Sequence, residues 1–361
     1  MKTILILGNS SAGLYDFRNE LVQELLAKYR VIVSLPDEVK TGLLAAQGCE
    51  IVHTPINRRG MNPAQDLGLL RAYRALLKQY RPDLVLTYTI KPNVYGGMAC
   101  AAAGVPYLAT VTGLGSAFQK KGAMLAVIRG LYRAGLRRAS CVFFQNEENR
   151  RIFKEGRILR GRDRLVSGSG VNLEKHPFSE YPAGEETRFL YVGRMMREKG
   201  IGEFLQAAGE LASDKVCFEL LGYCDEDWQE ALDAAQKQGK IRQLGFDPEV
   251  QSYYERCSAV VLPTYHEGMS NVLMEASASG RPVIASDIPG CREIFEEGKT
   301  GFGCAPRSAE ALTQALRKFL SLSASERAAM GRAAHEKMAA QFDRSGVVAA
   351  YREEIARIAP E

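Results

Sequence analysis

The chain has 361 residues, of which 46% are hydrophobic and 25% are charged, and its formal net charge is +5. A chain of this length and apolar content is expected to bury two cores rather than one. No apolar run approaches the roughly 18 residues of a membrane-spanning helix, and we expect no signal peptide. The eight cysteines show no CxxC pair and no metal-ligand spacing, so we interpret them as reduced core thiols of a cytoplasmic protein.

Short apolar runs alternate with helical stretches along the whole chain. This rhythm is typical of doubly wound parallel sheets, so the predicted fold class is α/β with two Rossmann-like domains. The predicted strands are Thr3–Leu7, Val31–Leu35, Leu84–Tyr88 and Cys141–Phe144 in the first half, and Phe189–Val192, Val216–Leu221, Val260–Leu262 and Pro282–Ala285 in the second.

The segment Gly8–Gly13 follows the first predicted strand. It lacks the spacing of a GxGxxG fingerprint, and no acidic residue ends the next strand, so a dinucleotide site is not indicated. Two interpretations stay open for this segment. It is either a phosphate-facing loop, in which Gly13 lets the backbone approach a ligand, or an ordinary turn between strand and helix.

Positive charge gathers in the first half of the chain. Residues 1–172 contain 25 lysines and arginines against 12 acidic residues, whereas the remainder contains 22 against 30. An apolar helix edged with cations is predicted over residues 124–138, and either packs with solvated arginines or lies at an anionic membrane surface. A nucleic-acid partner is not favoured, because no aromatic platform or binding motif accompanies the charge. A second basic helix face has three- and four-residue spacing and consists of Arg71, Arg74 and Lys78.

Residues 176–186 contain two prolines and a glycine and show no apolar periodicity. Such a composition is typical of a linker. We therefore expect an N-terminal domain over residues 1–175 and a C-terminal domain over residues 187–342.

A glycine and two spaced cations follow the strand predicted at Phe189–Val192. Arg194 and Lys199 would stand at the carboxyl end of this strand, where ligands bind in open α/β sheets. A guanidinium fork and a mobile ammonium group together suit a diphosphate. The pattern alone is weak evidence for a diphosphate site, because its charged residues are equally typical of a solvated helix start.

Glu267 and Glu275 bracket the start of a helix predicted over Asn271–Ser279. A helix N-terminus presents unpaired N–H groups and partial positive charge, which suit a diphosphate. Carboxylates on both sides of such a site can accept hydrogen bonds from hydroxyl groups at the two ends of a nucleotide sugar. Alternatively, one glutamate is a helix-dipole partner and the other is a solvated surface residue.

Together these residues resemble the C-terminal half of the retaining GT-B glycosyltransferases of family 4. The matching positions are Gly193-Arg194, Lys199-Gly200, Gly222, Gly245, Glu267-Gly268 and Glu275. The resemblance extends over nearly all of the chain and implies two Rossmann-like domains that face across a cleft. It also implies a nucleotide-sugar donor on the C-terminal domain, an acceptor on the N-terminal domain, and neither an essential metal nor a cofactor. Residues 343–361 are then a helix that crosses back to the N-terminal domain.

The resemblance implies roles for single residues. Arg194 and Lys199 grip the diphosphate, and with Glu267, which touches the donor sugar, they form the catalytic set. Glu275 contacts the ribose. The remaining donor-binding positions are Gly13, Gly193, Gly222, Gly245, Gly268, Met269, Ser270, Asn271, Val272 and Leu273.

Three segments of the first half narrow the resemblance, namely residues 11–18, 90–93 and 112–116. They are similar to bacterial transferases that extend undecaprenyl-diphosphate-linked sugars, including those acting on lipid-linked diacetylbacillosamine, and related capsule and O-antigen transferases match nearly as well. The similarity implies a UDP-sugar donor, a polyprenyl-diphosphate-linked saccharide acceptor and a peripheral location on the inner face of the plasma membrane. The acceptor-binding residues would be Lys91, Asn93, Thr112 and Gly113.

A catalytic base is not expected near the acceptor, because none of the four histidines lies in residues 110–116. We expect the anomeric configuration of the sugar to be retained, because the acceptor hydroxyl attacks the face from which the diphosphate leaves. The departing phosphate oxygen then accepts the hydroxyl proton. A double displacement with Glu267 as nucleophile is the less favoured route. A sugar-nucleotide epimerase and a non-catalytic sugar-nucleotide-binding partner are the alternative functions.

Overall fold

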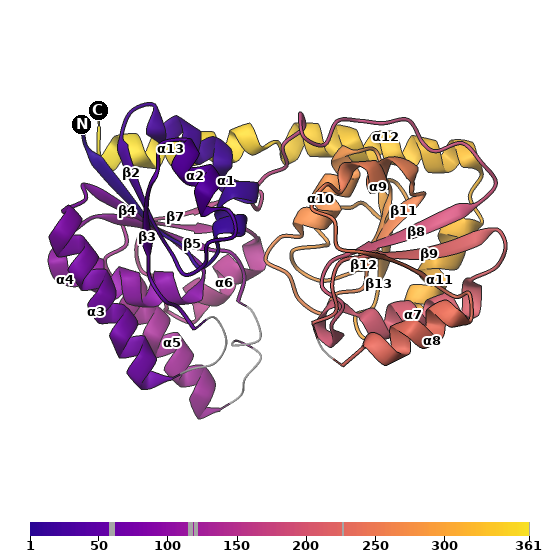
Figure 1. Ribbon diagram of the computed structural model, residues 1–361, viewed down its shortest axis with the longest axis horizontal. Helices are drawn as coiled ribbons and strands as arrows, with labels where there is room; N and C mark the ends of the chain where they lie inside the picture. Colours follow the sequence, from indigo (N-terminus) through magenta and orange to yellow (C-terminus); the bar gives the residue numbers. More distant parts are fainter. Residues whose placement is uncertain (58–61, 115–117, 119–121, 226, 361) are drawn as a thin grey trace. The chain divides into compact units, whose positions relative to one another are not determined.

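The computed structural model describes residues 1–57, 62–114, 118, 122–225 and 227–360. The chain folds into two compact α/β units, each built around a parallel sheet (Figure 1). Unit 1 comprises Met1–Ser169 and Gly346–Glu361, and unit 2 comprises Gly170–Ser345. Part of the predicted acceptor segment, residues 115–116, lies outside the described residues.

The sheet of unit 1 has seven strands in the order β3-β2-β1-β4-β5-β6-β7. All neighbouring strands are parallel; Ile4, for example, lies opposite Val31 on one side and Leu84 on the other. The inner strands are buried on both faces and are therefore almost continuously apolar. The strands are β1 (Thr3–Leu7), β2 (Arg30–Leu35), β3 (Glu50–His53), β4 (Leu84–Tyr88), β5 (Tyr107–Val111), β6 (Cys141–Phe144) and β7 (Asp163–Leu165).

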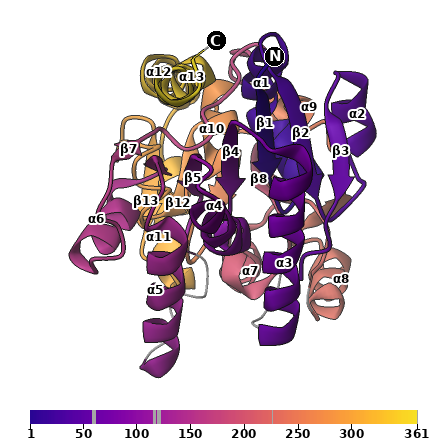
Figure 2. The ribbon, with the colours of Figure 1, turned by 90° about the vertical axis from the view of Figure 1, so that its left-hand side faces the viewer.

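Helices cover both faces of this sheet. One layer contains α3 (Pro63–Tyr80), the π-helix η1 (Pro92–Gly96), α4 (Gly97–Ala103), α5 (Ala123–Leu136) and α6 (Glu147–Glu155). Figure 2 shows α3, α4 and α5 of this layer. The opposite face packs against α1 (Ser11–Leu26), α2 (Thr41–Ala46) and α13 (Arg344–Ile358). Within the described residues, no helix is both long enough and apolar enough to cross a bilayer.

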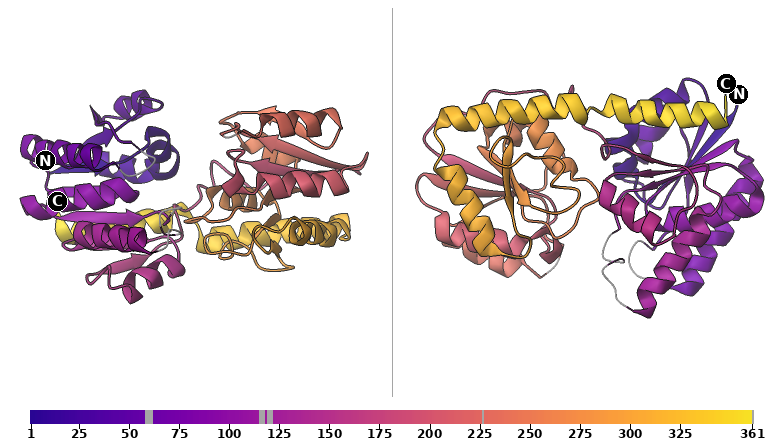
Figure 3. Two further views of the ribbon diagram at one scale, coloured as in Figure 1. Left: turned by 90° about the horizontal axis from the view of Figure 1, so that it is seen from below. Right: turned by 180° about the vertical axis from the view of Figure 1, so that it is seen from behind.

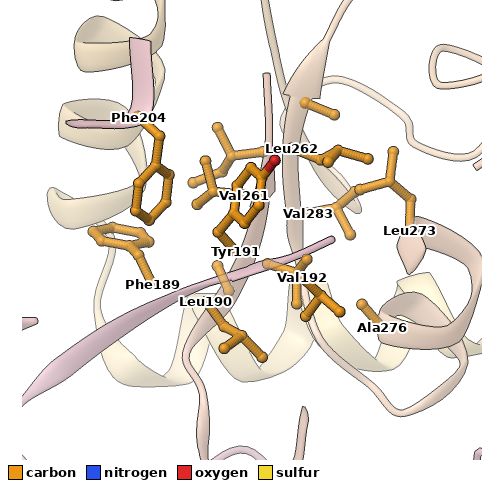
Figure 4. Packing of buried hydrophobic residues seen from close by; sticks show 14 of the residues in the cluster. Phe189, Leu190, Tyr191, Val192, Phe204, Val261, Leu262, Leu273, Ala276 and Val283 are labelled. Atoms are coloured by element: carbon orange, nitrogen blue, oxygen red, sulfur yellow. The ribbon is translucent and has the colours of Figure 1, made fainter. Parts of the chain in front are cut away.

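The sheet of unit 2 has six parallel strands in the order β10-β9-β8-β11-β12-β13. They are β8 (Thr187–Val192), β9 (Val216–Leu221), β10 (Arg242–Gly245), β11 (Ala259–Leu262), β12 (Val283–Ser286) and β13 (Gly301–Cys304). One face packs against α7 (Ile201–Leu211), α8 (Gln229–Lys237) and α11 (Ala309–Leu320), and the other against α9 (Gln251–Arg256), α10 (Asn271–Ala278) and α12 (Ala324–Gln341) (Figure 1). Figure 4 shows part of the core, where the rings of Tyr191 and Phe204 meet edge to face with centroids 5.4 Å apart.

The structure confirms the predicted α/β class with two doubly wound parallel sheets. All eight predicted strands are present, and the helix predicted from Asn271 ends one residue early, at Ala278. The apolar pattern does not predict β3, β5, β7, β10 or β13. Four of these are the outer strands of the two sheets, which are short and contain exposed or glycine residues, so they lack a continuous apolar run. The fifth, β5, is a buried inner strand as apolar as β4, and the sequence analysis missed it.

The chain enters unit 2 at Gly170, before the proline-containing segment that the sequence suggests as a linker. Val171 pairs with the other end of the unit, because its N–H donates to the Phe342 carbonyl over 2.8 Å. The segment 176–186 then packs on unit 2. The fully buried Arg281 guanidinium donates to the carbonyls of Ser179 and Glu180, each over 2.9 Å. These bonds explain why a stretch without periodicity is nevertheless part of a folded unit.

Helix α13 completes unit 1, and the two ends of the chain lie side by side there (Figure 3). The Tyr351 ring stacks on Phe143 of β6 with centroids 4.0 Å apart, and its hydroxyl lies 2.6 Å from Thr110 Oγ1 of β5. Glu354, only 1% exposed, accepts hydrogen bonds from Arg162 over 2.7 and 2.9 Å. A helix from the far end of the sequence is thus fixed to the unit-1 sheet by a ring stack and an ion pair.

We expect the Glu354→Gln variant to lose about 2 kcal/mol of unfolding free energy, because a buried carboxylate that bonds arginines is replaced by a neutral amide. Arginine neighbours hold the pKa of Glu354 below its usual value of 4.5. The contribution is therefore fully present above pH 4.5 and is lost as the pH falls through the lower folded-state pKa. Urea unfolding at pH 7 and pH 3 measures both effects. Glu353→Gln, at an exposed neighbouring position, is the control and should change stability by less than about 0.5 kcal/mol.

Candidate active site

Three glycines come together where neighbouring strands of unit 2 end. Gly193 follows β8, Gly222 follows β9 and Gly245 ends β10. The N–H of Gly222 donates to the carbonyl of Gly245 over 2.7 Å. A Cβ atom on Gly222 would lie 1.9 Å from the carbonyl oxygen of Gly193, so this contact requires glycine. The carboxyl edge of the sheet is therefore lined with bare backbone that a ligand can approach closely.

Lys199 ends a short 3-10 helix, η3 (Arg197–Lys199), in the loop after β8. This loop is fastened to the loop after β11, because the N–H of Tyr265 donates to the carbonyl of Glu198 over 2.9 Å. Gly200 fits between them with φ +74°, and a Cβ atom there would lie 2.1 Å from the Pro263 carbonyl oxygen. The two loops consequently have a fixed relative position.

Lys199 and Glu267 form an ion pair across these loops, 68 residues apart in sequence. Their side chains are 25% and 14% exposed, so both ends are sheltered but reachable. The pair brings together the cation and the carboxylate that the sequence predicts for the diphosphate and the sugar. The two opposite charges compensate each other.

Arg194 is held from two sides. Its guanidinium donates to Asp225 over 2.7 Å, and its carbonyl accepts a hydrogen bond from the Tyr191 hydroxyl over 2.8 Å. The Arg194 side chain is still 41% exposed, which leaves room for an anionic ligand. Asp225 is a site residue that the motif does not indicate, because its contact with Arg194 spans 31 residues.

The N-terminus of α10 lies next to the Glu267 loop. Ser270 caps the helix, because its Oγ accepts a hydrogen bond from the N–H of Leu273 over 3.4 Å. Among the described residues, the N–H groups of Asn271 and Val272 have no hydrogen-bond acceptor, as expected at a helix start. The buried Oδ1 atom of Asn271 has no partner there either. These unsatisfied groups point to an anion with hydroxyl groups, as the sequence predicts for residues 268–273.

The loop before α10 is supported by a turn that the sequence analysis does not identify. The N–H of Ser270 donates to the Gly290 carbonyl over 2.9 Å, and the N–H of Gly290 donates to Glu293 over 2.7 Å. Pro289-Gly290, three residues beyond the predicted strand at 282–285, is the available sequence signal for this turn. The support holds the helix start in place.

Glu275 lies one turn into α10 and is held by partners from two other segments. The buried Tyr254 hydroxyl donates to its Oε2 over 3.1 Å, and the His176 Nε2 lies 3.9 Å from its Oε1. Burial and the Glu275 charge raise the pKa of Tyr254 well above 10, so Tyr254 remains a hydrogen-bond donor. His176 is itself bonded to Gln251, and burial lowers its pKa to about 4. Glu275 therefore faces a neutral histidine at pH 7.

The predicted residues of the first half lie in unit 1. Gly13 is in the first turn of α1, where its N–H donates to Ser10 Oγ over 3.2 Å. Thr112 and Gly113 directly follow β5. They are partly exposed at the carboxyl edge of that strand, and their role in binding an acceptor stays a prediction.

Lys91 and Asn93 are occupied by contacts within unit 1. Lys91 pairs with the buried Asp66 over 2.7 Å. Asn93 is fully buried; its Oδ1 accepts from Thr87 and its Nδ2 donates to the Thr110 carbonyl, both over 2.7 Å. The Asn93 side chain thus ties η1 to the ends of β4 and β5, and it shapes the loop rather than presenting an atom to an acceptor.

Within the described ranges, no group of three or more histidine, cysteine, aspartate or glutamate residues is placed to hold a metal ion. The candidate donor site consists of the cations Arg194 and Lys199, the carboxylates Glu267 and Glu275, and the N-terminus of α10. All of these belong to unit 2, and each is positioned by contacts within that unit.

Comparison with known families agrees with this arrangement. Residues 186–322 match the model described as "Glycosyl transferases group 1", and residues 3–146 match the model "Glycosyl transferase 4-like". The chain belongs to the GT-B glycosyltransferases. This glycosyltransferase is 27% identical over 327 residues to N,N'-diacetylbacillosaminyl-diphospho-undecaprenol alpha-1,3-N-acetylgalactosaminyltransferase of Campylobacter jejuni, with 85% of this chain and 86% of that protein covered.

Solved structures share the fold of this GT-B glycosyltransferase. Sucrose-phosphate synthase from Thermosynechococcus elongatus superposes with a TM-score of 0.80 at 19% identity, over 99% of this chain and 100% of the other. HepE from Anabaena, solved in complex with UDP, gives a TM-score of 0.78 at 18% identity with the same coverage. At these identities the likeness establishes the GT-B fold alone.

Because His176 is buried and neutral, the unfolding free energy should depend on pH. Between pH 6.5 and 4 the unfolded chain takes up a proton at this histidine whereas the folded chain does not, so stability falls as the pH falls. From pH 8 to pH 5, wild type should lose about 2 kcal/mol relative to His176→Gln. Urea unfolding at both pH values measures this difference. The exposed His53→Gln control should follow wild type, and parallel profiles for wild type and His176→Gln would contradict the assignment.

Proposed function

We propose that this enzyme transfers a sugar with retention from a UDP-sugar to a polyprenyl-diphosphate-linked saccharide, and that the sugar is an N-acetylhexosamine. The observation that carries the proposal is the α10 N-terminus of unit 2, bracketed by Glu267 and Glu275 and faced by Lys199. The printed activity of the Campylobacter relative supports the substrate classes. A solved neighbour with the same fold was obtained with UDP bound.

The donor diphosphate would lie at the start of α10. There it meets the unsatisfied N–H groups, the ammonium of Lys199 and the guanidinium of Arg194. Positive charge from these groups stabilises the negative charge that develops as the sugar–phosphate bond breaks. Because side chains and backbone supply this charge, the proposal includes transfer without a metal ion.

Glu267 and Glu275 would bind hydroxyl groups at the two ends of the donor. Glu275, held by Tyr254, accepts hydrogen bonds from the ribose. Glu267, on the other side of the helix start, accepts from the sugar. The Lys199 contact keeps the Glu267 carboxylate oriented, and it also lowers its reactivity as a nucleophile. This pairing favours the same-face route over a double displacement through Glu267.

In the same-face route the acceptor hydroxyl oxygen attacks the anomeric carbon from the side on which the diphosphate departs. The bond between this carbon and the β-phosphate oxygen breaks, and its electron pair leaves with the nucleoside diphosphate. The hydroxyl proton passes to the departing phosphate oxygen. The stereochemistry at the anomeric carbon is retained, and no side-chain base is needed.

An enzyme with a lipid-linked acceptor must act at a membrane surface. We therefore propose that it binds peripherally to the inner face of the plasma membrane. Helix α5 supports this part of the proposal, because Met124 and Val127 are 46% and 49% exposed on a helix that ends in exposed cations. One of the predicted basic residues acts structurally, since Arg133 donates to the carbonyls of Gly156 and Arg157. A nucleic-acid partner is not part of the proposal.

We expect nucleoside-diphosphate release from UDP-sugars to depend on a polyprenyl-diphosphate-linked amino sugar, and to fall at least about 100-fold in Lys199→Ala and Glu267→Ala. The exposed α8 variant Lys237→Ala is the control and should keep the wild-type rate, and a chelator should leave that rate unchanged. Consumption of the donor without acceptor would indicate an epimerase. Binding of the donor without turnover would indicate a non-catalytic partner.

The Tyr254→Phe variant should raise the KM for the UDP-sugar about 5- to 10-fold with little change in kcat, because one hydrogen bond that orients Glu275 is lost. A 2'-deoxyribose donor removes a hydroxyl from the same contact and should reduce the difference between wild type and variant. Tyr253→Phe is the matched control, since its hydroxyl bonds to Asp247 instead. An equal effect in both variants would show that Tyr254 has no special role at Glu275.

A further inference from the structure

A basic groove of about 460 Å³ lies on unit 1, between the C-terminal half of α3 and α4. Its apolar wall includes Leu77, Ala102 and Val105. Its cations are Arg74, Lys78 and Arg81. The groove is thus an apolar trough with three positive charges, and the catalytic proposal uses none of these residues.

None of the three cations has a partner in the part of the chain that the structure describes. Among the described residues, no hydrogen bond or ion pair is formed by the side chains of Arg74, Lys78 or Arg81, whereas many other arginines, such as Arg162, are paired with carboxylates. Residues 62–140 contain eleven lysines and arginines but only two acidic residues. Both acids are occupied elsewhere, Asp66 by Lys91 and Asp83 by the N–H of Thr3. The charge of the groove is therefore left for an external anion.

The groove lies at the amino edge of the sheet, away from the carboxyl edge. It lies at the end of α3 that leads into β4, and beside the end of α4 that leads into β5, hence at the amino edge. Small-molecule ligands of open α/β sheets bind at the opposite, carboxyl edge. Helix α3 has 18 residues, so its two ends are about 27 Å apart. The groove is accordingly too far from the strand ends to hold the reacting sugar.

The rest of this helix layer indicates what lies against it. Helix α4 packs against both α3 and α5, and Figure 2 shows the three as one layer. Exposed apolar side chains stand near the starts of α3 and α5, namely Leu67, Met124 and Val127. The layer therefore presents apolar groups at one end and unpaired cations at the other. A bilayer surface offers matching partners, with acyl chains for the first and phosphates for the second.

We propose that the groove binds the headgroup phosphate of an anionic phospholipid. Arg74 and Arg81 offer planar forks for phosphate oxygens, and Lys78 adds a mobile charge. The apolar wall suits the glycerol and the first methylene groups of the lipid. This inference rests on the membrane location given under the proposed function, and it names the site and the ligand class that this location requires.

The test compares two double variants of the full chain. Arg74→Gln with Lys78→Gln removes two groove charges, and Arg160→Gln with Lys237→Gln removes two exposed charges elsewhere. Co-sedimentation is measured with phosphatidylcholine vesicles that contain or lack phosphatidylglycerol. Binding to the anionic vesicles should weaken about 30-fold in the groove variant and less than about 3-fold in the control. Equal weakening in both would show a diffuse charge effect and overturn the proposal.

A third variant, Ala102→Glu, tests the apolar wall by placing a carboxylate on an exposed position of α4. It should weaken anionic vesicle binding at least tenfold, while transfer to a water-soluble acceptor analogue stays at the wild-type rate. Unchanged vesicle binding, or a greater loss of binding to duplex DNA than to vesicles in the groove variant, would overturn the lipid site. Vesicle binding is read without any sugar substrate. Absence of transfer would therefore reject the proposed function and leave this result standing.

Discussion

The candidate site depends on the ion pair between Lys199 and Glu267. It joins the loop after β8 to the loop after β11, and it forms where Gly200 lets the first loop lie directly against the Pro263 carbonyl. The adjacent strands place these loops side by side, and the hydrogen bond between Tyr265 and Glu198 fixes their register. A cation and a carboxylate are thereby held beside the start of α10. Without these three contacts, the motif residues would share a sheet edge, but the two loops would have no fixed relative position.

Other groups of the site are also held by contacts between separate segments. Asp225 holds Arg194 and Tyr254 holds Glu275, so each group assigned to the donor has a second residue that orients it. The charges of Arg194, Lys199 and Glu267 are compensated by partners within unit 2. A diphosphate that binds there can therefore exchange one ion pair for another, and Arg194 and Lys199 are exposed enough to reach it. The groove on unit 1 is the opposite case, because its cations are left unpaired by the described residues.

Much of the fold could be predicted because the inner strands are continuous apolar runs, and the start of α10 could be predicted because a proline-ended strand precedes a good helix former. The outer strands could not, since β7 and β10 bury too little to leave an apolar pattern. In the site, residue types that carry charge at a strand end were predictable. The residues that orient these groups could not be predicted, because they come from separate segments that meet only in the folded chain. Examples are Asp225, which bonds Arg194, and Thr87 and Thr110, which bond Asn93.

The central claim is that the start of α10, with Lys199 and Glu267 beside it, binds the donor. The most direct measurement is a structure of the protein with UDP bound. We expect phosphate oxygens within hydrogen-bond distance of Lys199 Nζ and of the first N–H groups of α10, and ribose hydroxyls bonded to Glu275. A nucleotide bound elsewhere on unit 2, out of contact with Lys199 and Glu267, would show that this is not the donor site.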